Sequence, residues 1–266
     1  MPVKIQNTSQ KCIVFRFYGN LNELLTSKPH KPENRLTFKG RQTVKHLVES
    51  LGVPHTEVGL ILLDGQPVDF GYIPQDGERL AVYPHFSVLT NGQDENFQYS
   101  LNEKPRFLLD GHLGRLAAFL RMLGFDAQYD NRFGDEELTE LAYRDKRILL
   151  TRDRGLLKRK KIENGCCLLS LNPREQLLQV ARRYGLKKYF DPFTRCMACN
   201  GELRTVSKQE VLHELEPKTK LFYNLFMRCQ DCKKIYWAGS HHDRMQLLIT
   251  WLEDHISEKD KYIENL

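Results

Sequence analysis

The sequence FLLDGHLGRLAAFLRMLGFDAQYDNRFGDEELTELAYRDKRILLTRD, residues 107–153, holds two short apolar runs that each lead to an aspartate. The first run, 107–109, ends at Asp110, and the second, 148–151, leads to Asp153. Apolar residues at helical spacing lie between them, so the pattern predicts strands that alternate with helices. Such alternation indicates an α/β fold with a parallel sheet and right-handed crossovers.

Three acidic positions fall where ligands gather in such a sheet. Asp110 and Asp153 follow predicted strands, and Asp135 opens a predicted helix, with Glu136 and Glu137 as alternates beside it. Parallel strands end at one edge of an open sheet, where ligands bind, so we expect these carboxylates to converge. Converging carboxylates bind Mg²⁺ or Mn²⁺, which activate water for phosphodiester cleavage. Alternatively, each acid caps the helix that follows it, and one residue can serve both roles.

The same periodicity assigns the elements around these acids. It predicts strands at 125–129, 148–150 and 166–170, and helices at 113–123, 156–161 and 176–184. We expect Cys12, Cys166 and Cys167, which lie in apolar runs, to be buried as small hydrophobic residues.

Positive charge is concentrated around the proposed acidic site. Residues 105–190 hold 18 Lys and Arg against 11 Asp and Glu, and the whole chain carries a net charge of +6. A basic surround attracts polyanions such as nucleic acid, although solubility alone is the other explanation. Within the run 152–161, we expect phosphate contacts from Arg152, Arg154, Lys158 and Arg159, unless this run is only a solvated helix face.

Four of the seven cysteines form two CxxC pairs, Cys196 with Cys199 and Cys229 with Cys232. A CxxC turn supplies two thiolates from one knuckle, and two facing knuckles give the tetrahedral ligand set of a structural Zn²⁺ site. A redox pair and iron–sulfur ligation are the alternatives.

The segment after the second CxxC pair offers groups for RNA. We expect it to start a helix at Gly239 or Ser240, which places His241 and Arg244 on the first turn, where a phosphate is favoured. Tyr236 or Trp237 could stack a base. The alternative is packing within a zinc ribbon.

Residues 10–90 indicate a small separate domain. Strands are predicted at 13–18, 36–39, 58–63 and 79–83, with a helix at 43–51 and a hairpin turn at Asp64-Gly65. The order ββαββ in such a short segment is that of a β-grasp, ubiquitin-like domain.

These stretches resemble a known family. Residues 105–245 are similar to the Mut-seven-C-type RNase domain, a PIN-like nuclease fold with a zinc ribbon, and residues 10–90 resemble the ubiquitin-like domain that often precedes it. The matching stretches include 107–110, 114–117, 120–126, 135–138, 147–157, 173–177, both CxxC knuckles and 236–241.

The resemblance implies a ribonuclease that uses two divalent ions, with Asp110, Asp135 and Asp153 as ligands and Glu136 or Glu137 as further candidates. The chain departs from the pattern at Gly155, where many PIN-like relatives carry a second Asp, and at His242, where the family has an aromatic residue. The β-grasp domain lacks a C-terminal Gly-Gly, so we expect it to bind RNA or a protein partner rather than to be conjugated.

The sequence therefore predicts an α/β protein with five parts: a ubiquitin-like β-grasp domain (1–90), a linker (91–104), a PIN-like nuclease domain (105–190), a zinc ribbon (191–240) and a C-terminal helix (241–266). Its predicted function is a ribonuclease dependent on Mg or Mn and stabilised by structural Zn, and the alternative is a non-catalytic RNA-binding adaptor. With no long apolar run or signal-peptide core, we expect a cytoplasmic protein without membrane contact. The sequence carries no clear signal for oligomerisation.

Overall fold

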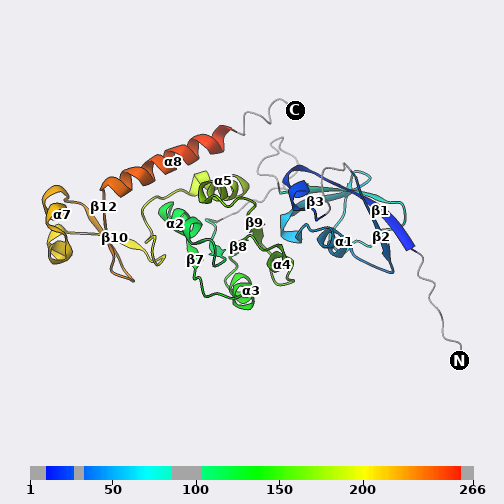
Figure 1. Ribbon diagram of the computed structural model, residues 1–266, viewed down its shortest axis with the longest axis horizontal. Helices are drawn as coiled ribbons and strands as arrows, with labels where there is room; N and C mark the ends of the chain where they lie inside the picture. The colour runs from blue at the N-terminus through cyan, green and yellow to red at the C-terminus, as the bar shows by residue number, and fades with distance from the viewer. Residues whose placement is uncertain (1–9, 27–32, 86–102, 259–266) are drawn as a thin grey trace. The chain divides into compact units, whose positions relative to one another are not determined.

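The structure, a computed structural model, describes residues 10–26, 33–85 and 103–258 (Figure 1). The chain forms two compact units. One contains Met1–Ser100 with Asp153–Cys167, and the other contains Leu101–Arg152 with Leu168–Leu266. No helix in the described ranges has both the length and the apolar character that are needed to cross a membrane.

The first unit contains the predicted β-grasp fold. Its strands are β1 (Gln10–Phe17), β2 (Asn34–Lys39), β3 (Val58–Leu63), β4 (Gln66–Pro67) and β5 (Arg79–Pro84), in the order β2-β1-β5-β3-β4. Strands β1 and β5 are parallel, and the other pairs are antiparallel. Helix α1 (Val44–Ser50) and the 3-10 turns η1 (Gly19–Leu24) and η2 (His55–Glu57) complete this fold.

Local sequence explains these elements. Ile13, Phe15 and Phe17 alternate along β1 and are all buried, as the period-2 pattern predicts. The side chain of Thr43 caps α1 by accepting a hydrogen bond from the N–H of His46. The φ angles of Asp64 and Gly65 are 48° and 82°, which close the tight turn between β3 and β4.

The second segment of this unit contains α4 (Arg154–Leu157) and β9 (Gly165–Cys167). The predicted basic helix at 156–161 is wrong in extent, because α4 ends at Leu157. Leu156 and Leu157 are the buried residues of α4, and residues 158–161 after them are all basic. The predicted strand at 166–170 is shorter than expected. Cys166 and Cys167 are buried, whereas Cys12 is only half-buried.

The second unit contains the predicted parallel strands and their helices. Strand β6 (Phe107–Leu109) is parallel to both β7 (Ala127–Tyr129) and β8 (Ile148–Thr151), so these strands lie in the order β7-β6-β8. All three residues of β6 are buried. Helices α2 (Gly114–Met122), α3 (Asp135–Arg144) and α5 (Pro173–Arg183) occur where predicted, and η4 spans Leu186–Tyr189.

The unit continues into a small antiparallel sheet with a long helix after it. Strands β10 (Leu203–Val206), β11 (Phe226–Cys229) and β12 (Ile235–Trp237) lie in the order β10-β11-β12. Between β10 and β11 the chain forms α6 (Lys208–Val211), η5 (Leu212–Glu214) and α7 (Pro217–Phe222), which the sequence analysis did not predict. Helix α8 (Ser240–Glu258) then packs against α5. The small core of this part contains Val206, Val211, Leu215 and Phe226.

Three predicted segments extend beyond the described residues. The residues outside them are 1–9, 27–32 and 86–90 of the predicted ubiquitin-like domain, 91–102 of the predicted linker and 259–266 of the predicted C-terminal helix. The described part of that helix, α8, begins at Ser240 as expected.

Candidate active site and metal centre

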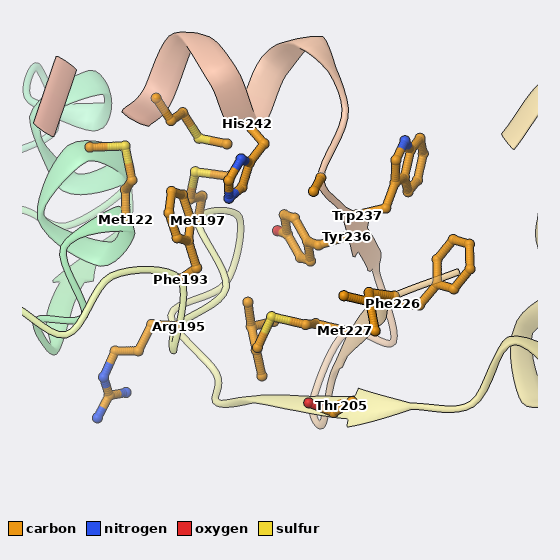
Figure 2. A pocket seen from close by; sticks show the side chains of 14 residues that line it. Met122, Phe193, Arg195, Met197, Thr205, Phe226, Met227, Tyr236, Trp237 and His242 are labelled. Atoms are coloured by element: carbon orange, nitrogen blue, oxygen red, sulfur yellow. The ribbon is translucent and has the colours of Figure 1, made fainter. Parts of the chain in front are cut away.

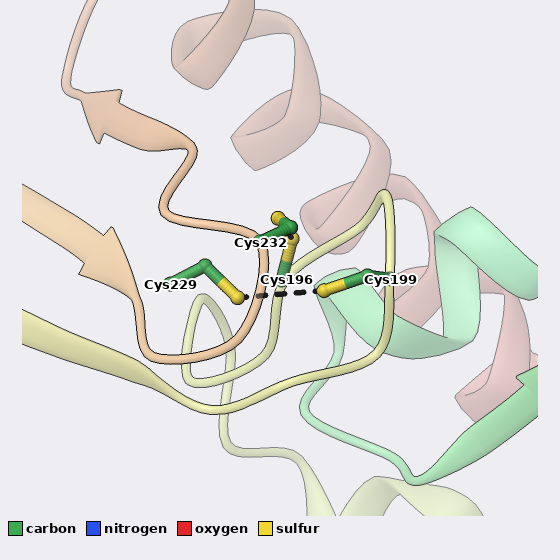
Figure 3. A group of neighbouring side chains, drawn as sticks. All are labelled: Cys196, Cys199, Cys229 and Cys232. Atoms are coloured by element: carbon green, nitrogen blue, oxygen red, sulfur yellow. Dashed lines mark hydrogen bonds between the residues drawn. The ribbon is translucent and has the colours of Figure 1, made fainter.

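Four cysteine sulfur atoms gather in the second unit (Figure 3). The Sγ atoms of Cys196, Cys199, Cys229 and Cys232 all lie within 4.8 Å of one another. Two of these Sγ–Sγ separations are 3.4 Å, between Cys199 and Cys229, and 3.6 Å, between Cys196 and Cys232. Four thiolates around zinc, at Zn–S distances of about 2.3 Å, lie about 3.8 Å apart. The cluster therefore has the donor set and approximate spacing of a zinc site.

The backbone of the first knuckle folds back on itself to place these thiols. The N–H of Cys196 donates to the carbonyl of Gly201 at 2.7 Å, and the N–H of Asn200 donates to the carbonyl of Cys196 at 2.9 Å. A Cβ atom on Gly201 would lie 2.3 Å from Oδ2 of Asp231 and 3.0 Å from Sγ of Cys229. The absence of a side chain at Gly201 therefore lets the two knuckles approach closely without displacing the Cys229 thiol.

The thiols differ in acidity. Burial raises the pKa of Cys196, but hydrogen bonds from the Tyr236 hydroxyl, 3.0 Å away, and from backbone N–H groups outweigh it and lower the pKa to about 7. The N–H of Lys234 lowers the pKa of Cys232, but burial and the three neighbouring thiols outweigh that contact and raise the pKa to about 12. Four thiolates repel one another at these distances, so the fully ionised cluster requires a cation such as Zn²⁺.

Arg121 connects the first knuckle to the parallel sheet. Its side chain is only 4% exposed. Nη1 donates to the carbonyls of Met197 and Ala198 at 3.1 and 2.9 Å, and Nε donates to the carbonyl of Ala127 in β7 at 2.8 Å. The sequence analysis missed this role, because one arginine in an amphipathic helix carries no distinguishing signal.

A second connection runs through Asp126. Its carboxylate accepts two hydrogen bonds from Arg147, at 2.8 and 3.0 Å, and one from Nδ2 of Asn200 at 2.7 Å. Burial raises the pKa of Asp126, but these hydrogen bonds outweigh it and hold the pKa below its usual value. Oδ1 of Asn200 also accepts from the N–H of Ala127 at 2.9 Å. The first knuckle is thus fixed to the parallel sheet next to β7.

Asp110 lies at the end of β6, as predicted. Its Oδ2 accepts a hydrogen bond from Oγ1 of Thr151, at the end of the neighbouring strand β8, at 2.7 Å. Its N–H donates to the carbonyl of Leu150 at 3.1 Å. The prediction that Asp110 caps the following helix is wrong, because Leu113 occupies the N-cap position of α2. The carboxylate instead faces the end of the adjacent strand.

Asp135 is the first residue of α3, and Glu136 and Glu137 follow it on the same turn. All three side chains are exposed. The prediction that Asp135 is the cap is wrong, because Gly134 is the N-cap residue and provides no side chain. Acidic residues in the first turn still stabilise a helix by their interaction with its dipole.

Asp153 is the N-cap of α4, as the alternative interpretation predicted. Its Oδ1 accepts hydrogen bonds from the N–H groups of Gly155, at 2.6 Å, and Leu156, at 3.3 Å. A carboxylate has two oxygens with about four lone-pair positions, so a capping aspartate retains acceptor capacity. Capping and metal binding are therefore compatible at this residue.

Among the described residues, only one group brings together three or more side chains that could bind a metal ion, and it consists of these four cysteines. The predicted carboxylates Asp110, Asp135 and Asp153 do not form a second such group within the described residues. Asp110 and Asp135 belong to the second unit and Asp153 to the first. The catalytic metal site consequently remains a prediction from the sequence.

The predicted RNA-binding residues have different surroundings. Nη1 of Arg154 donates to the carbonyl of Leu24, and Nζ of Lys158 donates to the carbonyl of Glu49, both at 2.6 Å within the first unit. Arg152 is exposed and Arg159 is half-buried. In the second unit, His241 and Arg244 are exposed at the start of α8.

Comparisons with known proteins agree with this architecture. Residues 105–249 match the family described as the Mut7-C RNAse domain, and residues 10–90 match the one described as Mut7-C ubiquitin. The chain belongs to the Mut7-C RNAse domain family. Among curated proteins, no sequence matches it.

Two solved structures are similar to part of this Mut7-C protein. Both are crystal structures of a small archaeal modifier protein, SAMP1, from Haloferax volcanii. Each is 18% identical, with TM-scores of 0.23 and 0.24. They cover 28% and 29% of the Mut7-C chain and 97% and 99% of their own.

Proposed function

We propose that this protein is a ribonuclease that hydrolyses phosphodiester bonds of single-stranded or structured RNA with the help of Mg²⁺ or Mn²⁺. Its membership of the Mut7-C RNAse family over residues 105–249 carries the proposal. The place of Asp110, at the end of β6 and hydrogen-bonded to the end of β8, supports it, because ligands of open α/β sheets bind at that edge.

The carboxylates of Asp110, Asp135 and Asp153, with Glu136 as a further ligand, would hold the divalent ion. The ion would supply Lewis-acid chemistry by lowering the pKa of a water molecule and neutralising charge on the phosphate. Thr151 would position Asp110 through its hydroxyl hydrogen bond. The zinc bound by the four cysteines would be structural, because four thiolates leave no open coordination position.

Basic side chains would hold the RNA strand. Arg152, Arg154, Lys158 and Arg159 would contact phosphates near Asp153, and His241 and Arg244 would contact them near the start of α8. Such contacts fix the register of a strand without reading its bases. The ubiquitin-like domain would bind a protein partner of this nuclease.

A cleavage assay on the full chain tests the proposal. The protein, freed of divalent ions other than its zinc, is incubated with a labelled RNA that contains a hairpin and a single-stranded arm, with Mg²⁺, with Mn²⁺ or with neither. We expect cleavage only with an added ion, and its loss in Asp110→Asn and Asp153→Asn. Asp145→Asn is the matched control, because Asp145 pairs with Arg144 at the opposite end of α3.

A non-catalytic RNA-binding adaptor is the second candidate, and the capping role of Asp153 is the observation that favours it. It predicts binding without added divalent ions, with an affinity that falls steeply with salt. RNA binding without cleavage under any of the three conditions would select the adaptor over the nuclease.

A further inference from the structure

A groove of about 570 Å³ opens on the surface of the zinc ribbon, between α7, β12 and the start of α8. Its walls include four aromatic residues: Phe222, Tyr223, Tyr236 and Trp237. A more apolar pocket of about 300 Å³ adjoins it and shares Tyr236, Trp237 and His242 (Figure 2). Both volumes are large enough for a small planar group. All the residues that line the groove and the pocket belong to the second unit.

The charged side chains that line this groove are two lysines, and two histidines lie beside them. Lys218 and Lys234 are exposed and belong to α7 and to the turn before β12, and His241 and His242 belong to α8. Among the described residues, no Asp or Glu lines either the groove or the adjoining pocket. The surface therefore combines aromatic faces with a positive rim.

Two of the aromatic residues are accessible, and a third is anchored by a hydrogen bond. Trp237 is 39% exposed and Phe222 is 74% exposed, which is unusual for such large apolar side chains. The hydroxyl of Tyr236 contacts Sγ of Cys196 at 3.0 Å, so the cysteine cluster anchors one wall. A binding surface that is already ordered loses little conformational entropy when a ligand binds.

We infer that this groove binds an unpaired nucleobase of single-stranded RNA, with Trp237 stacking on the base and Lys218 and Lys234 holding the flanking phosphates. Aromatic platforms inside a basic groove are the means by which proteins bind single strands without sequence preference. The inference rests on the proposed function and extends it, because it assigns the substrate class. A base in a duplex is stacked on its neighbours, so the groove selects unpaired RNA.

Fluorescence of Trp237 tests the inference directly. The chain has two tryptophans, so Trp251→Phe leaves Trp237 as the sole reporter in the full-length protein. Titration with an oligouridylate or oligoadenylate of eight nucleotides, without added divalent ions, is expected to quench this fluorescence. Trp237→Leu is expected to weaken binding of the labelled oligonucleotide roughly fivefold to a hundredfold.

Charge reversals on one helix provide the matched comparison. Lys218→Glu is expected to weaken RNA binding. Lys220→Glu changes the net charge by the same amount, but Lys220 lies outside the groove, so we expect a smaller loss of RNA affinity. Unquenched fluorescence, together with unchanged affinity in Trp237→Leu and Lys218→Glu, would overturn the inference. If Phe222→Ser changed the oligomeric state in solution but left RNA affinity unchanged, the groove would instead be a contact between copies of the chain.

The readout is independent of cleavage. Quenching in this titration, together with no cleavage in the separate assay with Mg²⁺ or Mn²⁺, would refute the nuclease and retain the base-binding groove. Cleavage in that assay, without quenching in this titration, would retain the nuclease and refute the groove.

Discussion

The carboxylate of Glu57 accepts a hydrogen bond from the backbone N–H of Cys167, 110 residues later in the chain, at 2.6 Å. Glu57 is only 1% exposed and lies in η2 of the β-grasp fold, whereas Cys167 ends β9. Nearby, Nε2 of His55 donates to the carbonyl of Ile162 at 2.9 Å. The β-grasp fold and the segment 153–167 therefore behave as one structural unit, although the family matches assign them to separate domains.

Removing the Glu57 carboxylate should destabilise that unit. Glu57→Ala leaves a buried N–H without its acceptor, which costs about 1–3 kcal/mol in the free energy of unfolding. Glu57→Gln keeps an acceptor oxygen and should lose less. Urea denaturation and hydrogen exchange of the Cys167 amide measure both effects, with Glu23→Ala on the exposed face of η1 as the control. Unchanged exchange at Cys167 in Glu57→Ala would contradict this prediction.

The basic residues near Asp153 should separate into two classes. Arg152→Gln and Lys158→Gln should each weaken RNA binding. Each should also reduce the slope of log affinity against log salt concentration by about one, because one phosphate contact is lost. Only Lys158→Gln should also lower stability, because Nζ of Lys158 bonds the carbonyl of Glu49. Chemical denaturation and binding titrations at several salt concentrations test the pair. Equal stability of the two variants would show that this hydrogen bond contributes nothing measurable.

Zinc content should follow the geometry of the knuckles. Cys199→Ser removes one of four ligands and should release the metal and unfold the ribbon, because structural zinc sites couple binding to folding. Gly201→Ala keeps every ligand, but its Cβ would lie 3.0 Å from Sγ of Cys229, so this ligand must shift and zinc should bind more weakly. Metal analysis after dialysis against a chelator gives the readout. Cys12→Ser, outside the cluster, should retain zinc as the wild type does.

Stability at acid pH should depend on Asp126. Hydrogen bonds from Arg147 and Asn200 hold its pKa below the usual value of about 3.9 for aspartate, against the effect of burial. The contribution of the Asp126 carboxylate to the free energy of unfolding is therefore fully present above the usual pKa of aspartate. It is lost as the pH falls through the lower pKa that Asp126 has in the folded protein. Asp126→Asn should lower stability by roughly 1–3 kcal/mol at neutral pH and flatten the acid limb of the Tm profile.

Asp130→Asn is the control for this pH profile. Asp130 pairs with Arg132, whose side chain is 85% exposed, so solvent screens the interaction. We expect a small effect on Tm at neutral pH. If Asp126→Asn and Asp130→Asn gave the same Tm profile, the buried network around Asn200 would not stabilise the fold.

The sequence predicted those features that depend on local pattern. Alternation of Ile13, Phe15 and Phe17 marked β1, and the CxxC spacing marked the zinc-type cluster, because each pattern reflects the geometry of one element. The helix predicted at 156–161 was wrong in extent, because residues 158–161 are all basic and add no apolar side chain to the helix. Only Leu156 and Leu157 are anchored by packing, and the helix ends after them.

Long-range contacts were not predictable from local patterns. Arg121 gives no sign of its bonds to Met197 and Ala198, more than 70 residues later, and Glu57 gives none of its bond to Cys167. The ribbon groove was missed for the same reason, since α7 and β12 are brought together only by folding. Tyr236 and Trp237 were noted as stacking candidates because they follow the second knuckle directly.

Two substitutions at Asp153 separate capping from metal binding. Asparagine and aspartate are comparable N-cap residues, whereas alanine loses about 1 kcal/mol of stability at such a position. Asp153→Asn should therefore keep the stability of α4, and Asp153→Ala should lose about that amount. A metal ligand requires the negative charge, so both variants should lose cleavage if Asp153 binds Mg²⁺ or Mn²⁺. Thermal melts and the RNA cleavage assay, made on the same samples, decide the matter. Cleavage at the wild-type rate by Asp153→Asn, with loss of stability only in Asp153→Ala, would leave Asp153 as a helix cap and remove it from the proposed metal site.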